Sequence, residues 1–204
     1  MKRDVSSKGP KALIRLENTR KPRRLLIVCE GEKTEPNYFR GFPNNPKVYD
    51  RIKVYGTGHN TVSLVKKAIK LKKDALEKNE RYIEIWCVFD KDDFSIEQFN
   101  KAIELAKQNN IECAYSIEAF ELWYMLHFNF YDSALSREQY KEKLTGLLGK
   151  TYKKNDTGMY ELLEDKQSEA IQNARTLYFR QSKLPPAKQN PITTVHKLVE
   201  RLLS

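Results

Sequence analysis

Residues 24–119 alternate short apolar runs with longer amphipathic segments, and this alternation is the strongest constraint on the fold. The apolar runs, rich in aliphatic, β-branched and aromatic residues, are predicted as strands at 24–29, 51–55, 82–89 and 111–117. Helices are predicted between them at 34–40, 61–79 and 95–109. Strands joined through helices form parallel sheets with right-handed crossovers. The pattern therefore predicts an α/β, Rossmann-like fold with a mostly parallel four-stranded sheet flanked by helices.

The remainder of the chain is predicted to be helical. Helices are expected at 120–128, 137–148, 158–165, 167–182 and 191–203. Asn190-Pro191 is typical of the cap and first turn of a helix, which places the start of the last one. We therefore expect three parts: a basic N-terminal arm at 1–23, an α/β core at 24–119, and a helical C-terminal extension at 120–204 packed on the core.

Positive charge is concentrated at the N-terminus. The net charge is +10, and residues 1–24 hold nine lysines and arginines against Asp4 and Glu17, a net of +7 that leaves +3 for the rest. A basic segment of this kind indicates either a polyanionic partner, with Arg23 and Arg24 contacting nucleic acid, or simply a solvated tail.

The cysteines and the hydropathy pattern indicate a cytoplasmic protein. Cys29, Cys87 and Cys113 lie in short apolar runs without C-x-x-C spacing, so we interpret them as reduced, buried thiols. No apolar stretch approaches the roughly 20 residues needed to span a bilayer, and the N-terminus lacks an apolar signal-peptide core. We expect no membrane association.

Acidic residues follow two of the predicted strands. Glu30 comes directly after the first strand, and Asp90 and Asp92 follow the third. Ligands collect at the carboxyl ends of parallel strands. Carboxylates gathered there repel one another unless a cation neutralises them, and Mg²⁺ or Mn²⁺ suits such oxygen ligands. Aspartate also ends many strands merely as a turn residue, but for these acids together we favour a metal site.

Several motifs resemble the RloB-like protein family, in the same order and over nearly the whole chain after residue 24. They are LIVCEGEKTEPNYF at 26–39, VFDKDD at 88–93, FELW at 120–123 with His127, and NP at 190–191 with TVH at 194–196.

That family is similar to Toprim domains, the metal-dependent fold of topoisomerases, bacterial primases and related nucleases. In Toprim proteins a glutamate after the first strand and an Asp-x-Asp after the third carry the chemistry, which implies catalytic roles for Glu30, Asp90 and Asp92. RloB-like proteins occur in restriction-linked and abortive-infection loci. The resemblance therefore implies phage defence and an AAA- or ABC-type ATPase partner encoded nearby.

The chain departs from the Toprim pattern in its second acid. Many Toprim proteins place it four residues after the first glutamate, where this chain has Thr34, and the nearest acid is Glu35. By analogy with Toprim nucleases, Glu121 binds a second metal. Its alternative role is that of an acid favoured by the dipole at a helix N-terminus.

Several other residues have either a functional or a purely structural interpretation. Lys33, Lys91 and His196 are candidate nucleic-acid contacts, although His196 also fits a partly exposed helix histidine. We interpret His127 as a buried structural histidine, Gly56-Thr57-Gly58 as a turn, and Lys153 and Lys154 as ordinary surface lysines.

Two functions follow. The first is a Mg²⁺- or Mn²⁺-dependent nuclease that cleaves RNA or DNA through Glu30, Asp90 and Asp92, with Glu35 or Glu121 completing a second metal site. The second is a non-catalytic subunit that binds nucleic acid or an ATPase through the arm and the helical half.

Overall fold

A computed structural model describes residues 22–58, 60–91 and 95–204. Its centre is a parallel four-stranded sheet in the order β2-β1-β3-β4, which confirms the predicted α/β, Rossmann-like class. Asp92 and most of the predicted basic arm lie outside the described residues. The elements of the first half are β1 (Arg24–Cys29), α1 (Thr34–Arg40), β2 (Arg51–Gly56), α2 (Thr61–Glu77), β3 (Tyr82–Lys91), α3 (Ile96–Gln108) and β4 (Glu112–Ile117).

The second half is helical, as expected. Its elements are α4 (Glu121–Met125), α5 (Arg137–Leu148), α6 (Met159–Leu163), η1 (Glu164–Lys166), α7 (Gln167–Gln181), η2 (Pro186–Lys188) and α8 (Val195–Leu203). The expected start of the last helix at Pro191 is wrong, because α8 begins only at Val195. The preceding residues instead bond to β4: the Thr194 N–H donates to the Tyr115 carbonyl, and the Ile117 N–H donates to the Ile192 carbonyl.

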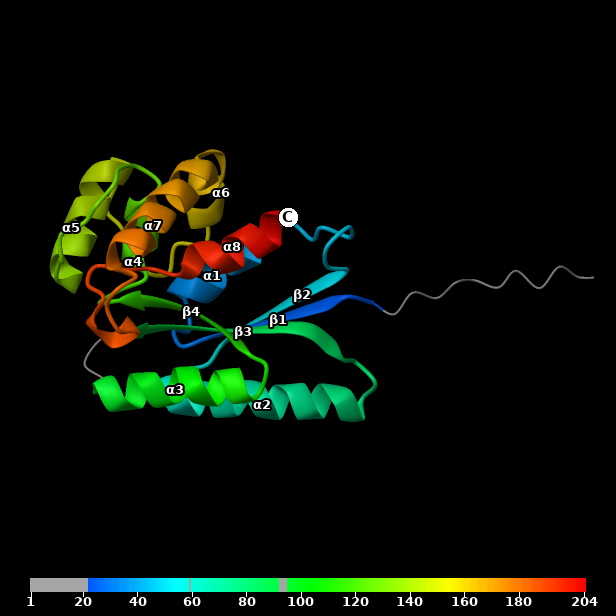
Figure 1. The fold of residues 1–204 in the computed structure, drawn as a ribbon. Helices are drawn as coiled ribbons and strands as arrows, with labels where there is room; N and C mark the ends of the chain where they lie inside the picture. The colour runs from blue at the N-terminus through cyan, green and yellow to red at the C-terminus, as the bar shows by residue number, and fades with distance from the viewer. Residues whose placement is uncertain (1–21, 59, 92–94) are drawn as a thin grey trace, which may run out of the picture.

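The sheet lies between two helical layers, which Figure 1 shows from the side. Side chains of a strand alternate between the faces of a sheet. Leu26 and Val28 of β1 belong to the hydrophobic cluster under α2 and α3, whereas Leu25 and Ile27 belong to the cluster shared with α1 and the C-terminal helices. Both faces of β1 are therefore buried, as expected for a central parallel strand. None of the described helices is long and apolar enough to cross a membrane.

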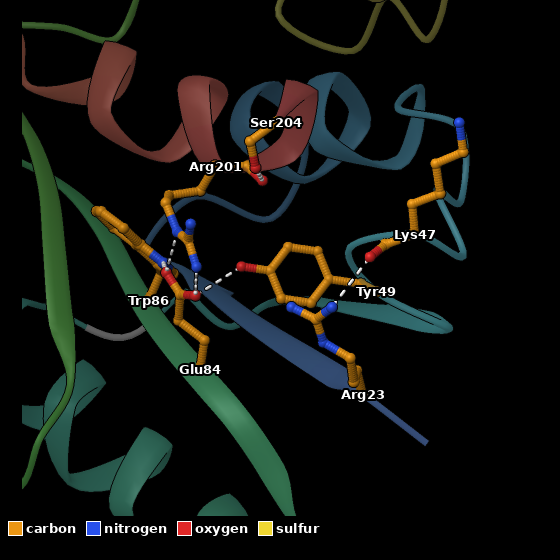
Figure 2. A network of polar contacts seen from close by, with 7 residues as sticks. All are labelled: Arg23, Lys47, Tyr49, Glu84, Trp86, Arg201 and Ser204. Carbon is orange, nitrogen blue, oxygen red and sulfur yellow. Dashed lines mark hydrogen bonds and ion pairs between the residues drawn. The ribbon is translucent and has the colours of Figure 1, made fainter. Parts of the chain in front are cut away.

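A polar network ties the C-terminal helix to the sheet (Figure 2). Glu84 of β3 accepts hydrogen bonds from the Tyr49 hydroxyl at 2.6 Å, the Trp86 indole N–H at 2.8 Å and two nitrogens of Arg201 at 2.9 and 3.3 Å. Burial alone would raise the pKa of Glu84, but these donors outweigh it and hold the pKa below its usual value. Glu84 thus joins α8 to the centre of the sheet and to the loop before β2.

Replacing Arg201 by Met tests this clamp while keeping an apolar stem. We expect a loss of about 1–2 kcal/mol in the free energy of unfolding at pH 7, the range for charge-assisted hydrogen bonds reduced for partial solvent exposure. Because the folded-state pKa of Glu84 is depressed, its contribution is complete above the usual glutamate pKa and fades as the pH falls through the folded value. Urea unfolding at pH 7 and pH 3.5 measures both effects.

The matched control is Arg175→Met, which removes the exposed ion pair between Arg175 and Glu200. It should leave the free energy of unfolding nearly unchanged, because solvent screens an ion pair this exposed. Equal losses in the two variants would contradict a special role for the Glu84 network.

Candidate active site

A cavity of about 340 Å³ opens at the carboxyl ends of β1 and β3. The turn after β1 and the first turn of α1 form one wall, β3 contributes its end, and the C-terminal half supplies the remainder. Its lining consists of Glu30, Gly31, Glu32, Lys33, Thr34, Glu35, Asp90, Phe120, Glu121, Arg137 and Lys154. This is the edge of the sheet at which ligands of parallel α/β proteins bind.

Glu30 and Asp90 meet because β1 and β3 are neighbours in the sheet. The Glu30 N–H donates to the Val88 carbonyl at 2.8 Å, which continues the ladder one residue beyond β1. The Glu30 carboxylate accepts the Asp90 N–H at 3.2 Å. Two acids that are 60 positions apart in the sequence are thereby held at one place.

Asp90 carries a strongly perturbed carboxylate. Burial raises its pKa well above the usual value, and the charges of Glu35, Glu121 and Glu30 raise it further. The Phe120 N–H donates to Asp90 at 3.2 Å and acts in the opposite direction. Four carboxylates therefore share one electrostatic environment.

Glu35 sits in the first turn of α1 and folds back over Gly31. A Cβ atom added to Gly31 would overlap the Glu35 carboxylate, so a larger residue there would require the Glu35 side chain to move. Burial raises the pKa of Glu35, and the charge of Glu121 adds to the increase, whereas the N–H groups of Glu35 and Gly31 oppose it. The acid that departs from the Toprim spacing thus points into the same cavity.

Glu121 begins α4 and is 5% exposed. Its Oε1 accepts a hydrogen bond from the Tyr152 hydroxyl at 3.0 Å and lies 3.8 Å from the Lys154 ammonium nitrogen. A carboxylate at this depth is costly to bury unless it has partners of this kind. The 150–157 segment between α5 and α6, here called the 150–157 loop, supplies both partners.

The model of the RloB-like protein family matches residues 25–202, which is nearly all of the chain. The chain belongs to the RloB-like protein family. No curated protein and no solved structure is significantly similar to it. All residues that line the cavity lie inside the matched region of this RloB-like chain.

The structure brings together only some of the predicted site residues. Glu30, Glu35, Asp90, Glu121 and Lys33 line the cavity, and Lys33 is exposed at its edge. Asp92 is outside the described residues, so its predicted role stays a prediction.

Other predicted contacts of the RloB-like chain lie elsewhere. Lys91 is half-buried and does not line the cavity. Arg23 and Arg24 stand at the start of β1, the opposite end of the sheet, where Arg23 donates to the Lys47 carbonyl and Arg24 pairs with Glu80 at 3.9 Å.

The expectation of a partly exposed His196 is wrong. The side chain is 4% exposed and its ring packs against Tyr178, with ring centroids 6.0 Å apart. Burial lowers the pKa of His196 to about 4, so the ring is neutral at pH 7. His196 is not part of the cavity lining.

One structural interpretation is confirmed: His127 is buried, and its Nδ1 lies 2.9 Å from the Trp123 carbonyl oxygen. Gly56-Thr57-Gly58, predicted as a turn, instead consists of the last residue of β2 and two residues after it, and the N–H groups of Thr57 and Gly58 donate to the carbonyls of Cys29 and Glu30. Gly58 has a φ of +62°, a conformation that glycine adopts without strain.

Sequence reasoning missed three residues that the C-terminal half contributes. Arg137 and Lys154 line the cavity, and Tyr152 bonds to Glu121. The interpretation of Lys154 as an ordinary surface lysine is wrong, although that of the exposed Lys153 stands. These residues could not be predicted from a local sequence pattern, because only tertiary packing places them near the strand ends.

The carboxylates of the cavity are of the type that binds a hard divalent cation, but their oxygens are not arranged around one point as metal ligands are. The lining offers the carboxylate oxygens that Mg²⁺ and Mn²⁺ prefer, from Glu30, Glu35, Asp90, Glu121 and the exposed Glu32. Within 22–58, 60–91 and 95–204, no three histidine, cysteine, aspartate or glutamate side chains form a group ready to hold a metal. A cation already stands beside one acid, however: the Lys154 ammonium next to Glu121. The residues therefore fit a cation in charge and chemistry.

Asp90→Asn tests the electrostatic crowding directly. Because the folded-state pKa of Asp90 is raised, its charge destabilises the fold above the usual aspartate pKa, and this cost disappears as the pH falls below it. The variant should melt several degrees higher than the parent at pH 7.5 without divalent cations, and the difference should vanish near pH 3.5. Thermal unfolding followed by circular dichroism measures it.

Asp165→Asn is the control, since Asp165 is exposed in η1 and away from the cavity. It should leave the melting temperature nearly unchanged at both pH values. A lower melting temperature for Asp90→Asn at pH 7.5 would contradict the account of Asp90 as a repelled charge.

Proposed function

We propose that this RloB-like chain is a Mg²⁺- or Mn²⁺-dependent nuclease that hydrolyses phosphodiester bonds of RNA or DNA. The observation that carries the proposal is the convergence of Glu30, Glu35, Asp90 and Glu121 on one cavity, where three of the charges raise the pKa of Asp90. Protein folds seldom gather unneutralised buried charges without function. A divalent cation bound there would remove the repulsion and supply Lewis-acid stabilisation of the phosphoryl oxygens.

The resemblance to Toprim proteins assigns roles to individual residues. Glu30 serves as general acid or base near the attacking or leaving oxygen, and Asp90 and Asp92 hold the cation. Glu35 and Glu121 are the candidates for a second cation site, and the structure places both in the cavity lining. The Glu30 carboxylate is held by the Asp90 N–H, so it is already oriented toward the third strand before substrate arrives.

Basic groups around the acids support a phosphate substrate. Lys33, Arg137 and Lys154 line the same cavity as the carboxylates. The Arg137 Nε donates to the Glu118 carbonyl at 3.1 Å, which fixes the guanidinium at the wall. Guanidinium groups bind phosphate oxygens in a defined geometry, and ammonium groups bind them as point charges. A mixed lining of acids and bases suits a bound cation together with a phosphodiester.

The proposed biological role rests on the resemblance to RloB-like proteins. We propose a cytoplasmic role in prokaryotic anti-phage defence, with an AAA- or ABC-type ATPase encoded nearby as partner. The alternative is a non-catalytic subunit of such a complex that binds nucleic acid or the ATPase. The net charge of +7 over residues 1–24 supports that alternative.

Cleavage assays test the nuclease directly. Labelled single- and double-stranded RNA and DNA are incubated with the full chain and Mg²⁺ or Mn²⁺. We expect cleavage of at least one substrate class, its loss in EDTA, and a decrease of at least about 100-fold in Glu30→Gln, because a positioned acid–base group contributes about that much or more. Circular dichroism should show that the variant remains folded.

The matched control is Glu112→Gln, which removes an exposed carboxylate at the opposite end of the sheet. It should cleave as the parent does. Cleavage by Glu30→Gln at the parental rate would overturn the catalytic assignment. Absence of both cleavage and cation binding in the parent would support the non-catalytic alternative.

A further inference from the structure

The 150–157 loop is fastened to α1 from the C-terminal half. The Thr34 hydroxyl donates to the Lys154 carbonyl at 3.1 Å, and the Asn37 side-chain amide donates to the Asn155 carbonyl at 3.5 Å. Within the loop, the Lys150 ammonium pairs with Asp156 at 3.0 Å. The backbone of the loop is therefore fixed at the cavity independently of the Lys154 side chain.

Two side chains of this loop meet the same oxygen of Glu121. Tyr152 is mostly buried and donates its hydroxyl proton to Oε1 at 3.0 Å, whereas the Lys154 ammonium lies 3.8 Å from that atom. The Lys154 side chain is 53% exposed and Glu121 only 5%. Tyr152 is thus held in the protein, while Lys154 has open solvent on its other side.

The charge of Lys154 reaches beyond Glu121. The Lys154 side chain lines the same cavity as Glu30, Glu35 and Asp90. In the metal-free protein, the Lys154 ammonium beside Glu121 therefore offsets part of the repulsion within the cluster.

We propose that Lys154 is a built-in counter-ion of the carboxylate cluster, which a divalent cation displaces when it binds. This inference rests on the proposed metal-dependent function and adds a determinant of cation affinity to it. Displacement needs no backbone movement, because the ammonium can rotate into solvent while Thr34 still holds the Lys154 carbonyl. Tyr152 remains bonded to Glu121 and acts as a positioning residue that keeps this carboxylate directed at the cavity.

The physical consequence is a trade between stability and affinity. With Lys154 in place, the metal-free cluster is less repulsive and the cation must compete with a charge of the same sign. Without the Lys154 charge, the carboxylates attract a divalent cation more strongly, but the metal-free protein is less stable to unfolding. Lys153, which is exposed beside it, lacks a contact with the acids among the described residues and provides the matched comparison.

Calorimetric titration of Mn²⁺ into the full chain at pH 8, after treatment with EDTA, tests the inference. Lys154→Met removes the charge and keeps an apolar stem of similar length. We expect it to bind Mn²⁺ about fivefold more tightly than the parent, because removal of a partly screened like charge at this distance has an effect of that order. Lys154→Arg should restore the parental affinity, and Lys153→Met should stay within about twofold of it.

Thermal unfolding provides a second readout. Without Mn²⁺, Lys154→Met should melt at a lower temperature than Lys153→Met, and saturating Mn²⁺ should remove the difference. Parental or weaker Mn²⁺ binding by Lys154→Met would overturn the counter-ion role and leave the nuclease proposal intact. Absence of Mn²⁺ binding in the parent would instead overturn the metal-dependent function and this inference with it.

Discussion

Repulsion among carboxylates in one cavity is the constraint on which the rest of the site depends. Glu30, Glu35, Asp90 and Glu121 all bear on the same space, and burial there makes each charge more costly than it would be in water. The chain offsets this cost locally through backbone N–H groups, through the Tyr152 hydroxyl and through the Lys154 ammonium. Those compensations fix where the acids point.

The architecture explains how the acids converge. Neighbouring parallel strands β1 and β3 end side by side, so Glu30 and Asp90 meet without help from other elements. The C-terminal helices lie above the sheet in Figure 1, and the C-terminal half contributes Phe120, Glu121, Arg137 and Lys154 to the cavity lining. It also supplies Tyr152 and Lys154, the partners of Glu121. The clamp between Glu84 and Arg201 fastens the last helix to the same sheet. Stability and site are therefore linked through packing of the two halves.

Much of this could be predicted from the sequence, because the signals are local. Apolar runs between amphipathic segments identified all four strands, and their parallel arrangement placed Glu30 and Asp90 together. The start of α8 could not be predicted, since Ile192 and Thr194 satisfy their backbone groups against β4 instead of forming a first helical turn. Lys154 was misjudged for a related reason: only long-range contacts carry the 150–157 loop to Glu121.

Anomalous X-ray diffraction from crystals of the full chain soaked in Mn²⁺ tests the central claim most directly. The account predicts a manganese peak in the cavity at the ends of β1 and β3, at about 2–2.5 Å from carboxylate oxygens of Asp90 and at least one of Glu30, Glu35 and Glu121. The Lys154 ammonium should have moved away from Glu121. A cavity without a peak at saturating Mn²⁺, with Lys154 still beside Glu121, would contradict it.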